Sequence, residues 1–248
     1  MAKSKEVTVA GEHLPVETTR PSFMGDTARG QENVGTDDIT IPRLDVIQSL
    51  SPQRKKNDPA YIEGAEEGLL FNTVSGELYG KSVIFVPVFF RKEFVVWKDR
   101  KSGGGFNGAF STKAEAEAHA TSLGEDFEVQ DTAQQFGLIW RPESTPDNPV
   151  LEEIVISMAK SKMKVSRQLN TMCKMAGGDR FERAYEISSA HVEGTKGEYE
   201  SLVVKPLGFV NEPVYRAAEK LYEAISSGQR DVNREYEGES TDSSDREY

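Results

Sequence analysis

The segment VIFVPVFFRKEFVVW, residues Val83–Trp97, is the strongest β signal in this sequence. Its first half is apolar at every position, whereas its second half admits Arg91, Lys92 and Glu93. A continuous run of β-branched and aromatic residues is typical of a strand that is covered on both faces. We therefore predict a long strand that is buried at one end, reaches solvent at the other and bends near Pro87.

Shorter segments with the same residue types lie on both sides of this strand. They cover residues 39–47, 68–73, 136–140, 150–158, 183–188 and 199–207. Ser75-Gly76 and Gly194–Gly197 supply turn residues between neighbouring segments, as antiparallel connections require. The sequence therefore predicts a body that is built mainly of β-strands.

Three further segments have helical signatures. Thr112 and Glu115 have the spacing of a capping box at the start of an alanine-rich run, 114–123. Residues 161–176 repeat apolar residues at helical spacing, and a last amphipathic run follows Asn211. We expect one helix inserted among the strands, one basic helix and one C-terminal helix.

These elements predict an α+β fold that is mainly β. A β-rich body with an inserted helix and a C-terminal helix is compatible with an OB-like barrel, a fold that binds single strands on an exposed strand face. Composition predicts a flexible N-terminal arm at 1–37, an OB-like nucleic-acid-binding domain at 38–227 and an acidic disordered tail at 228–248.

The charge is distributed unevenly along the chain. The formal net charge is −11, which by itself disfavours a phosphate-rich partner. Residues 228–248 hold seven acids and three bases, whereas 161–176 hold four bases and no acid. A surface helix in so acidic a chain is expected to carry some acids, so this pattern favours a basic binding face. An ordinary solvated helix face remains the alternative.

Aromatic and basic residues that alternate along the chain are the candidate binding residues. Rings stack on bases and neighbouring cations contact phosphates. The candidate nucleic-acid-binding residues are Phe94, Trp97, Phe106, Arg91, Lys92, Lys160, Lys164, Arg167 and Lys174. Burial of these rings in the core is the alternative interpretation.

Other classes of function lack a signature. A single cysteine and three histidines without zinc spacing predict no disulfide and no metal site. No local motif for a nucleophile, a carboxylate pair or a phosphate loop is present, so we expect no enzymatic activity and no cofactor. The absence of an apolar run of 18 residues or a secretory signal predicts a cytoplasmic protein without a membrane partner.

The order of these features resembles phage-encoded single-stranded DNA-binding proteins. The shared features are a β-rich body with an aromatic and basic face, followed by an acidic, serine-rich tail that ends on the aromatic Tyr248. Segments DITIPRLDVIQSLSP (38–52), FNTVSGELYGKSVIFVPVFF (71–90) and ISMAKSKMKVSRQLNTM (156–172) are also similar to those of tailed-phage proteins. The resemblance implies that the tail recruits replication or recombination proteins and that the protein acts in the host-cell cytoplasm.

The sequence thus predicts a non-catalytic protein that binds single-stranded DNA in phage replication or recombination. The alternative is a protein-interaction module that binds and redirects a host enzyme, which suits the negative charge better. The sequence leaves open a homo-oligomer, the choice between DNA and RNA, and a purely solubilising role for the tail.

Overall fold

The computed structural model describes residues 5–9, 12–16, 29–34, 41–141, 145, 148–194 and 197–228. The chain divides into two units, Met1–Asp38 and Ile39–Tyr248. In the first unit, β1 (Lys5–Val9) pairs with β2 (Glu12–Val16) as an antiparallel hairpin. Residues 5–9 and 12–16 therefore form strands within the segment that was predicted as a flexible arm. The predicted acidic tail lies, from residue 229 on, outside the described residues.

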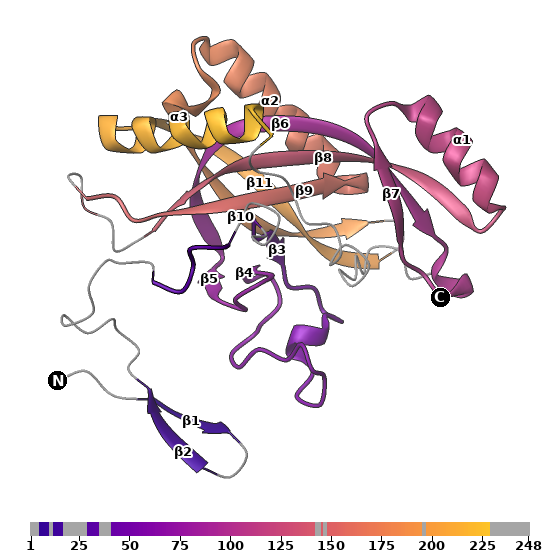
Figure 1. The fold of residues 1–248 in the computed structure, drawn as a ribbon, viewed down its shortest axis with the longest axis horizontal. Helices are drawn as coiled ribbons and strands as arrows, with labels where there is room; N and C mark the ends of the chain where they lie inside the picture. The colour runs from indigo at the N-terminus through magenta and orange to yellow at the C-terminus, as the bar shows by residue number, and fades with distance from the viewer. Residues whose placement is uncertain are drawn as a thin grey trace. The chain divides into compact units, whose positions relative to one another are not determined.

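Six antiparallel strands form the main sheet of the second unit, with β6 at its centre (Figure 1). The spatial order is β11, β10, β6, β8, β9, and β7 pairs with the C-terminal half of β6. The strands are β6 (Ser82–Lys98), β7 (Phe106–Phe110), β8 (Phe127–Trp140), β9 (Leu151–Ala159), β10 (Arg183–Gly194) and β11 (Gly197–Phe209). The long strand predicted at Val83–Trp97 is thus confirmed as β6.

The predicted α+β fold that is mainly β is confirmed, whereas the predicted OB-like closure is not observed. In the part of the chain that the structure describes, β9 and β11 form the two edges of the sheet and do not pair with each other. The sheet is therefore open. Both of its faces are covered by helices, so it buries its apolar residues without closing on itself.

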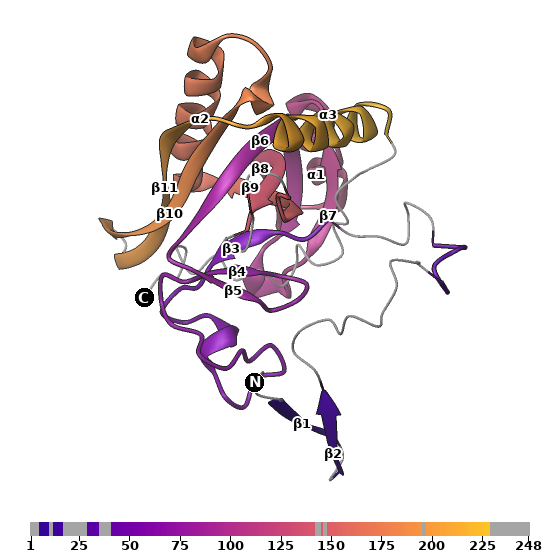
Figure 2. The same cartoon turned by 90° about the vertical axis from the view of Figure 1, so that its left-hand side faces the viewer.

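Three helices cover the main sheet: α1 (Lys113–Leu123), α2 (Met163–Ala176) and α3 (Glu212–Ser226). Val165 and Leu169 of α2 pack against one face, here called the α2 face, with Phe85 in the same core. Val214 and Leu221 of α3 pack against the other face, the α3 face. Figure 2 shows α2 and α3 on opposite sides of β6 and β8. No helix among the described residues is long and apolar enough to cross a membrane.

A small three-stranded sheet completes the core beneath the α2 face. It consists of β3 (Leu44–Val46), β4 (Leu70–Asn72) and β5 (Leu78–Gly80), in that order. Leu44, Val46 and Leu70 share a core with the main sheet and α2. The small sheet therefore belongs to the same packed body as the main sheet.

Candidate nucleic-acid interface

The basic side chains of α2 point away from the core. Lys164, Arg167 and Lys174 are exposed, while Val165 and Leu169 on the opposite side of the helix are buried. None of the three cations has a carboxylate oxygen within 4.0 Å among the described residues. The basic face expected from the sequence is therefore an accessible row of positive charges.

A buried polar network fixes α2 on the sheet. Gln135 of β8 is fully buried and donates from Nε2 to Ser166 Oγ at 2.9 Å and to Asn170 Oδ1 at 3.2 Å. Arg180 donates to Gln135 Oε1 at 2.5 Å and to Asn170 Oδ1 at 2.7 Å. Burial lowers the pKa of the Arg180 guanidinium from its usual value. These bonds satisfy buried polar groups and set the orientation in which α2 presents its cations.

The N-terminal end of α2 borders a shallow groove of about 300 Å³. The groove lies along β8 where β9 has ended, and its lining residues are Glu128, Val129, Gln130, Asp131, Lys160, Met163 and Arg167. Asp131 is paired with Lys92 at 3.0 Å, which offsets its charge. The groove therefore mixes acids with bases, and the purely basic surface is the row Lys164, Arg167 and Lys174.

The predicted aromatic residues do not lie on one surface. In β6, Phe94 and Val96 pack with α1, on the α2 side of the sheet. Trp97 has the opposite strand parity and therefore points to the other face. There its ring contacts Phe106 of β7, with ring centroids 5.9 Å apart at an interplanar angle of 73°. The three rings expected to form one stacking platform are thus divided between two faces.

The two basic residues predicted on β6 are already engaged. Arg91 lies 3.8 Å from the carboxylate of Glu93, which is only 4% exposed, and stands over the Phe136 ring at 5.3 Å. Lys92 lies over the Phe94 ring at 4.8 Å. Both cations therefore contribute to internal contacts of the sheet, whereas the cations of α2 do not.

One exposed ring was missed by the sequence analysis. Phe209, at the end of β11, is 70% exposed and carries the Arg183 guanidinium 4.1 Å from its ring centroid. Phe209 also lines a shallow hollow of about 400 Å³ together with Tyr215 and Arg216 of α3. Arg183 and Phe209 form the cation and aromatic pair that a base can stack on.

The geometry defines an open α+β protein with two helix-covered faces and one row of accessible cations. The chain belongs to the Pam3 phage gp34-like protein family, whose model matches residues 10–231. This membership indicates the bacteriophage origin expected from the sequence. No curated protein sequence matches the chain, and no solved structure matches it.

Proposed function

We propose that this protein binds single-stranded DNA without catalysing a reaction, through the exposed side of α2. The observation that carries the proposal is the row Lys164, Arg167 and Lys174, which is accessible and lacks carboxylate partners among the described residues. Cations that are not engaged in the protein are available to replace the counterions of a phosphate backbone. Lys160, in the short 3-10 turn that precedes α2, is exposed next to this row.

Stacking on Phe209 is the second element of the proposal. A phosphate row alone does not distinguish single strands from duplexes, because both carry the same charge groups. An exposed ring under a guanidinium favours unpaired bases, whose flat faces are accessible only in single strands. We therefore propose that the backbone follows α2 and that one base stacks on Phe209.

Fluorescence anisotropy with a labelled single-stranded oligonucleotide tests this function. The triple variant K164A/R167A/K174A is expected to lose at least tenfold in affinity at about 0.1 M salt. The matched control K81A/K205A/K220A removes three exposed lysines elsewhere and is expected to bind as the wild type does. Equal losses in both triple variants, or no binding by the wild type at low salt, would refute the proposal. Duplex DNA and RNA of the same length serve as competitors.

A second candidate function, docking of a partner protein, is favoured by the edge strand β11. Leu207 and Phe209 are 54% and 70% exposed, and β11 pairs on one side only within the residues that the structure covers. Such an apolar edge suits the addition of a strand from another protein. Leu207→Asp is expected to abolish docking at this edge and to leave oligonucleotide binding unchanged, whereas removal of residues 229–248 tests a partner that the acidic segment holds. Oligonucleotide binding is expected to stay or increase without this acidic segment, whereas a partner held by its acids is lost.

A further inference from the structure

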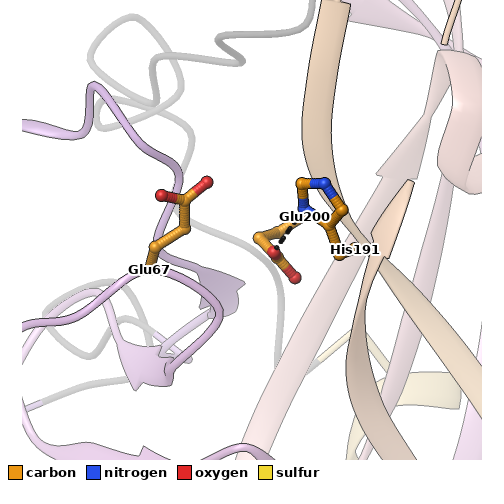
Figure 3. Close-up of side chains that lie close together, drawn as sticks. All are labelled: Glu67, His191 and Glu200. Carbon is orange, nitrogen blue, oxygen red and sulfur yellow. Dashed lines mark hydrogen bonds and ion pairs between the residues drawn. The ribbon is translucent and has the colours of Figure 1, made fainter. Parts of the chain in front are cut away.

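Three side chains with metal-ligating atoms converge where the small sheet meets the end of the β10–β11 hairpin. Glu67, His191 and Glu200 each offer a ligand atom, and these atoms lie within 4.8 Å of one another. Figure 3 shows Glu67 on one side and His191 with Glu200 on the other, with Glu200 and His191 joined by a hydrogen bond. The nitrogen Nδ1 of His191 lies 3.1 Å from Oε1 of Glu200.

Regular backbone structure holds two of these residues together. His191 and Glu200 are direct partners in the register of β10 and β11, so their side chains emerge side by side on one face. The backbone of Glu200 is fixed on both sides by Gln48, which donates to its carbonyl at 2.8 Å and accepts from its N–H at 2.8 Å. The position of Glu200 is therefore set before any ligand arrives.

A tight turn brings Glu67 to the same place. The N–H of Leu69 donates to the carbonyl of Glu66 at 3.2 Å, and Gly68 has φ +82° within this turn. A Cβ at Gly68 would lie 3.3 Å from Oε2 of Glu200. Glycine thus supplies both the left-handed conformation and the space for the turn to approach Glu200 closely.

The charges of the cluster are unbalanced. Glu200 is only 8% exposed, and among the described residues no Lys or Arg nitrogen lies within 4.0 Å of its carboxylate. Glu67 is paired with Arg54 at 3.4 Å, and Glu198 lies 3.7 Å from Nε2 of His191. Three carboxylates therefore face one guanidinium and one imidazole. A buried carboxylate without a fixed cation is costly unless a positive partner binds it.

We propose that Glu67, His191 and Glu200 bind a divalent transition-metal ion of the Zn²⁺ type. One imidazole nitrogen with two carboxylate oxygens is a ligand set that suits such ions, whereas Mg²⁺ and Ca²⁺ prefer oxygen ligands alone. Ligand atoms about 2.0–2.2 Å from a tetrahedral ion lie about 3.3–3.6 Å apart. The Nδ1 to Oε1 distance is already close to this value, and the partly exposed Glu67 needs only a small rotation.

Two neighbouring groups support this assignment. Glu198 faces Nε2, the imidazole nitrogen that is turned away from Glu200. A carboxylate behind a ligating histidine orients the ring and raises its basicity. Arg54 is also bound to the carbonyl of Ser49 at 2.6 Å, so it stays in place when Glu67 turns to the ion. A bound ion would join the turn at Glu67 to the β10–β11 hairpin and stabilise the small sheet against the main sheet.

Calorimetric titration of the tag-free, full-length protein with ZnCl₂ tests the site. The wild type is expected to bind one Zn²⁺ per chain, and at a hundredfold excess over Kd its unfolding temperature is expected to rise by about 5–10 °C. His191→Ala and Glu67→Gln are each expected to weaken binding at least tenfold. Glu193→Gln is the matched control, because Glu193 is an exposed acid of the same hairpin that lies outside the cluster.

The outcomes separate clearly. Lack of Zn²⁺ binding by the wild type, equal binding by all variants, or equal competition by millimolar Mg²⁺ would each overturn the proposal. Circular dichroism of each variant without metal controls for folding, and Glu67→Gln lies on a partly exposed turn where loss of the fold is not expected. Failure of this site leaves the proposed DNA binding untouched, because no residue of the cluster lies on α2.

Discussion

The salt dependence of the proposed DNA binding is the most specific consequence expected from the exposed cations on α2. Each phosphate contact made to a single strand contributes about 0.7 to the slope of log K against log salt. Lys164, Arg167 and Lys174 are the exposed cations of α2 without carboxylate partners among the described residues. Replacing all three with alanine is therefore expected to lower the magnitude of the slope by about 2.

This change in slope corresponds to a large difference in affinity. Between about 50 and 200 mM salt, three contacts account for about a 20-fold loss in affinity, so the triple variant is expected to lose about 20-fold less than the wild type over that range. Stability should be unaffected, because exposed substitutions usually stay within about 0.5 kcal/mol and alanine favours a helix. Anisotropy titrations at four salt concentrations measure both slopes.

An unchanged slope in K164A/R167A/K174A would refute the reasoning, even if its affinity fell at one salt concentration. A loss of affinity without a change in slope would mean that the three residues shape the site and do not contact phosphates. The control K81A/K205A/K220A has the same change in net charge, so it distinguishes local contacts from the overall field of the protein.

Further predictions concern single positions. Lys160 has φ +47°, a left-handed conformation that costs about 1 kcal/mol for residues other than glycine. Lys160→Gly should therefore keep or raise the free energy of unfolding, which denaturation measures. The same variant should weaken DNA binding about fivefold at 0.1 M salt, which anisotropy measures. Gly137→Ala should destabilise the fold by about 3 kcal/mol in urea, since its Cβ would clash with the backbone of β6. Burial raises the pKa of the Tyr185 phenol above its usual 10.0. The free energy of unfolding therefore keeps this contribution below pH 10 and loses it as the pH rises further. Tyr185→Phe should reduce this loss, which denaturation midpoints at pH 9 and 11 measure. In Trp140→Phe, the fluorescence of Trp97 should not be quenched by oligonucleotide, because Trp97 faces away from α2; strong quenching would contradict the separation of the two faces.

Much of the fold was predictable because local signals and packing agree. Thr112 caps α1, with its hydroxyl accepting from the N–H of Glu115, and Asn211 caps α3 by accepting from the N–H of Val214. The basic helix begins at Met163, two residues later than predicted. In these helices the apolar residues that predicted the helix are also the ones that face the sheet.

The extent of β8 was not predictable from hydrophobic periodicity. The strand begins at Phe127, whereas the sequence predicted only 136–140. Its central residues Gln134 and Gln135 are polar yet fully buried, because Ser157 and Ser166 satisfy their side chains across the sheet and from α2. The partners in these two hydrogen bonds are 23 and 31 positions apart in the sequence. The hydrophobic pattern within a single segment therefore gives no sign of them.

The cluster proposed to bind a metal ion shows the same limit for sites. His191 and Glu200 are nine residues apart, and their contact follows from the register of β10 and β11. Glu67 joins them from a turn more than a hundred residues earlier in the chain. The sequence contains no zinc spacing for the proposed ligand set, because that set depends on strand pairing and on Gly68, neither of which leaves a short motif.

The division of the predicted binding residues has a simple geometric cause. Phe94 and Trp97 are three positions apart in one strand, and because successive side chains alternate, an odd spacing places them on opposite faces. The composition of the β6 segment showed the mixture of aromatic and basic residues that is typical of a nucleic-acid-binding strand. Composition does not show on which face of the strand each side chain lies. In α2 the three cations Lys164, Arg167 and Lys174 are spaced so that they lie on one side of the helix. The proposed contacts to a phosphate backbone therefore lie on the helix and not on the strand, and the proposed stacking ring, Phe209, belongs to a different element, β11.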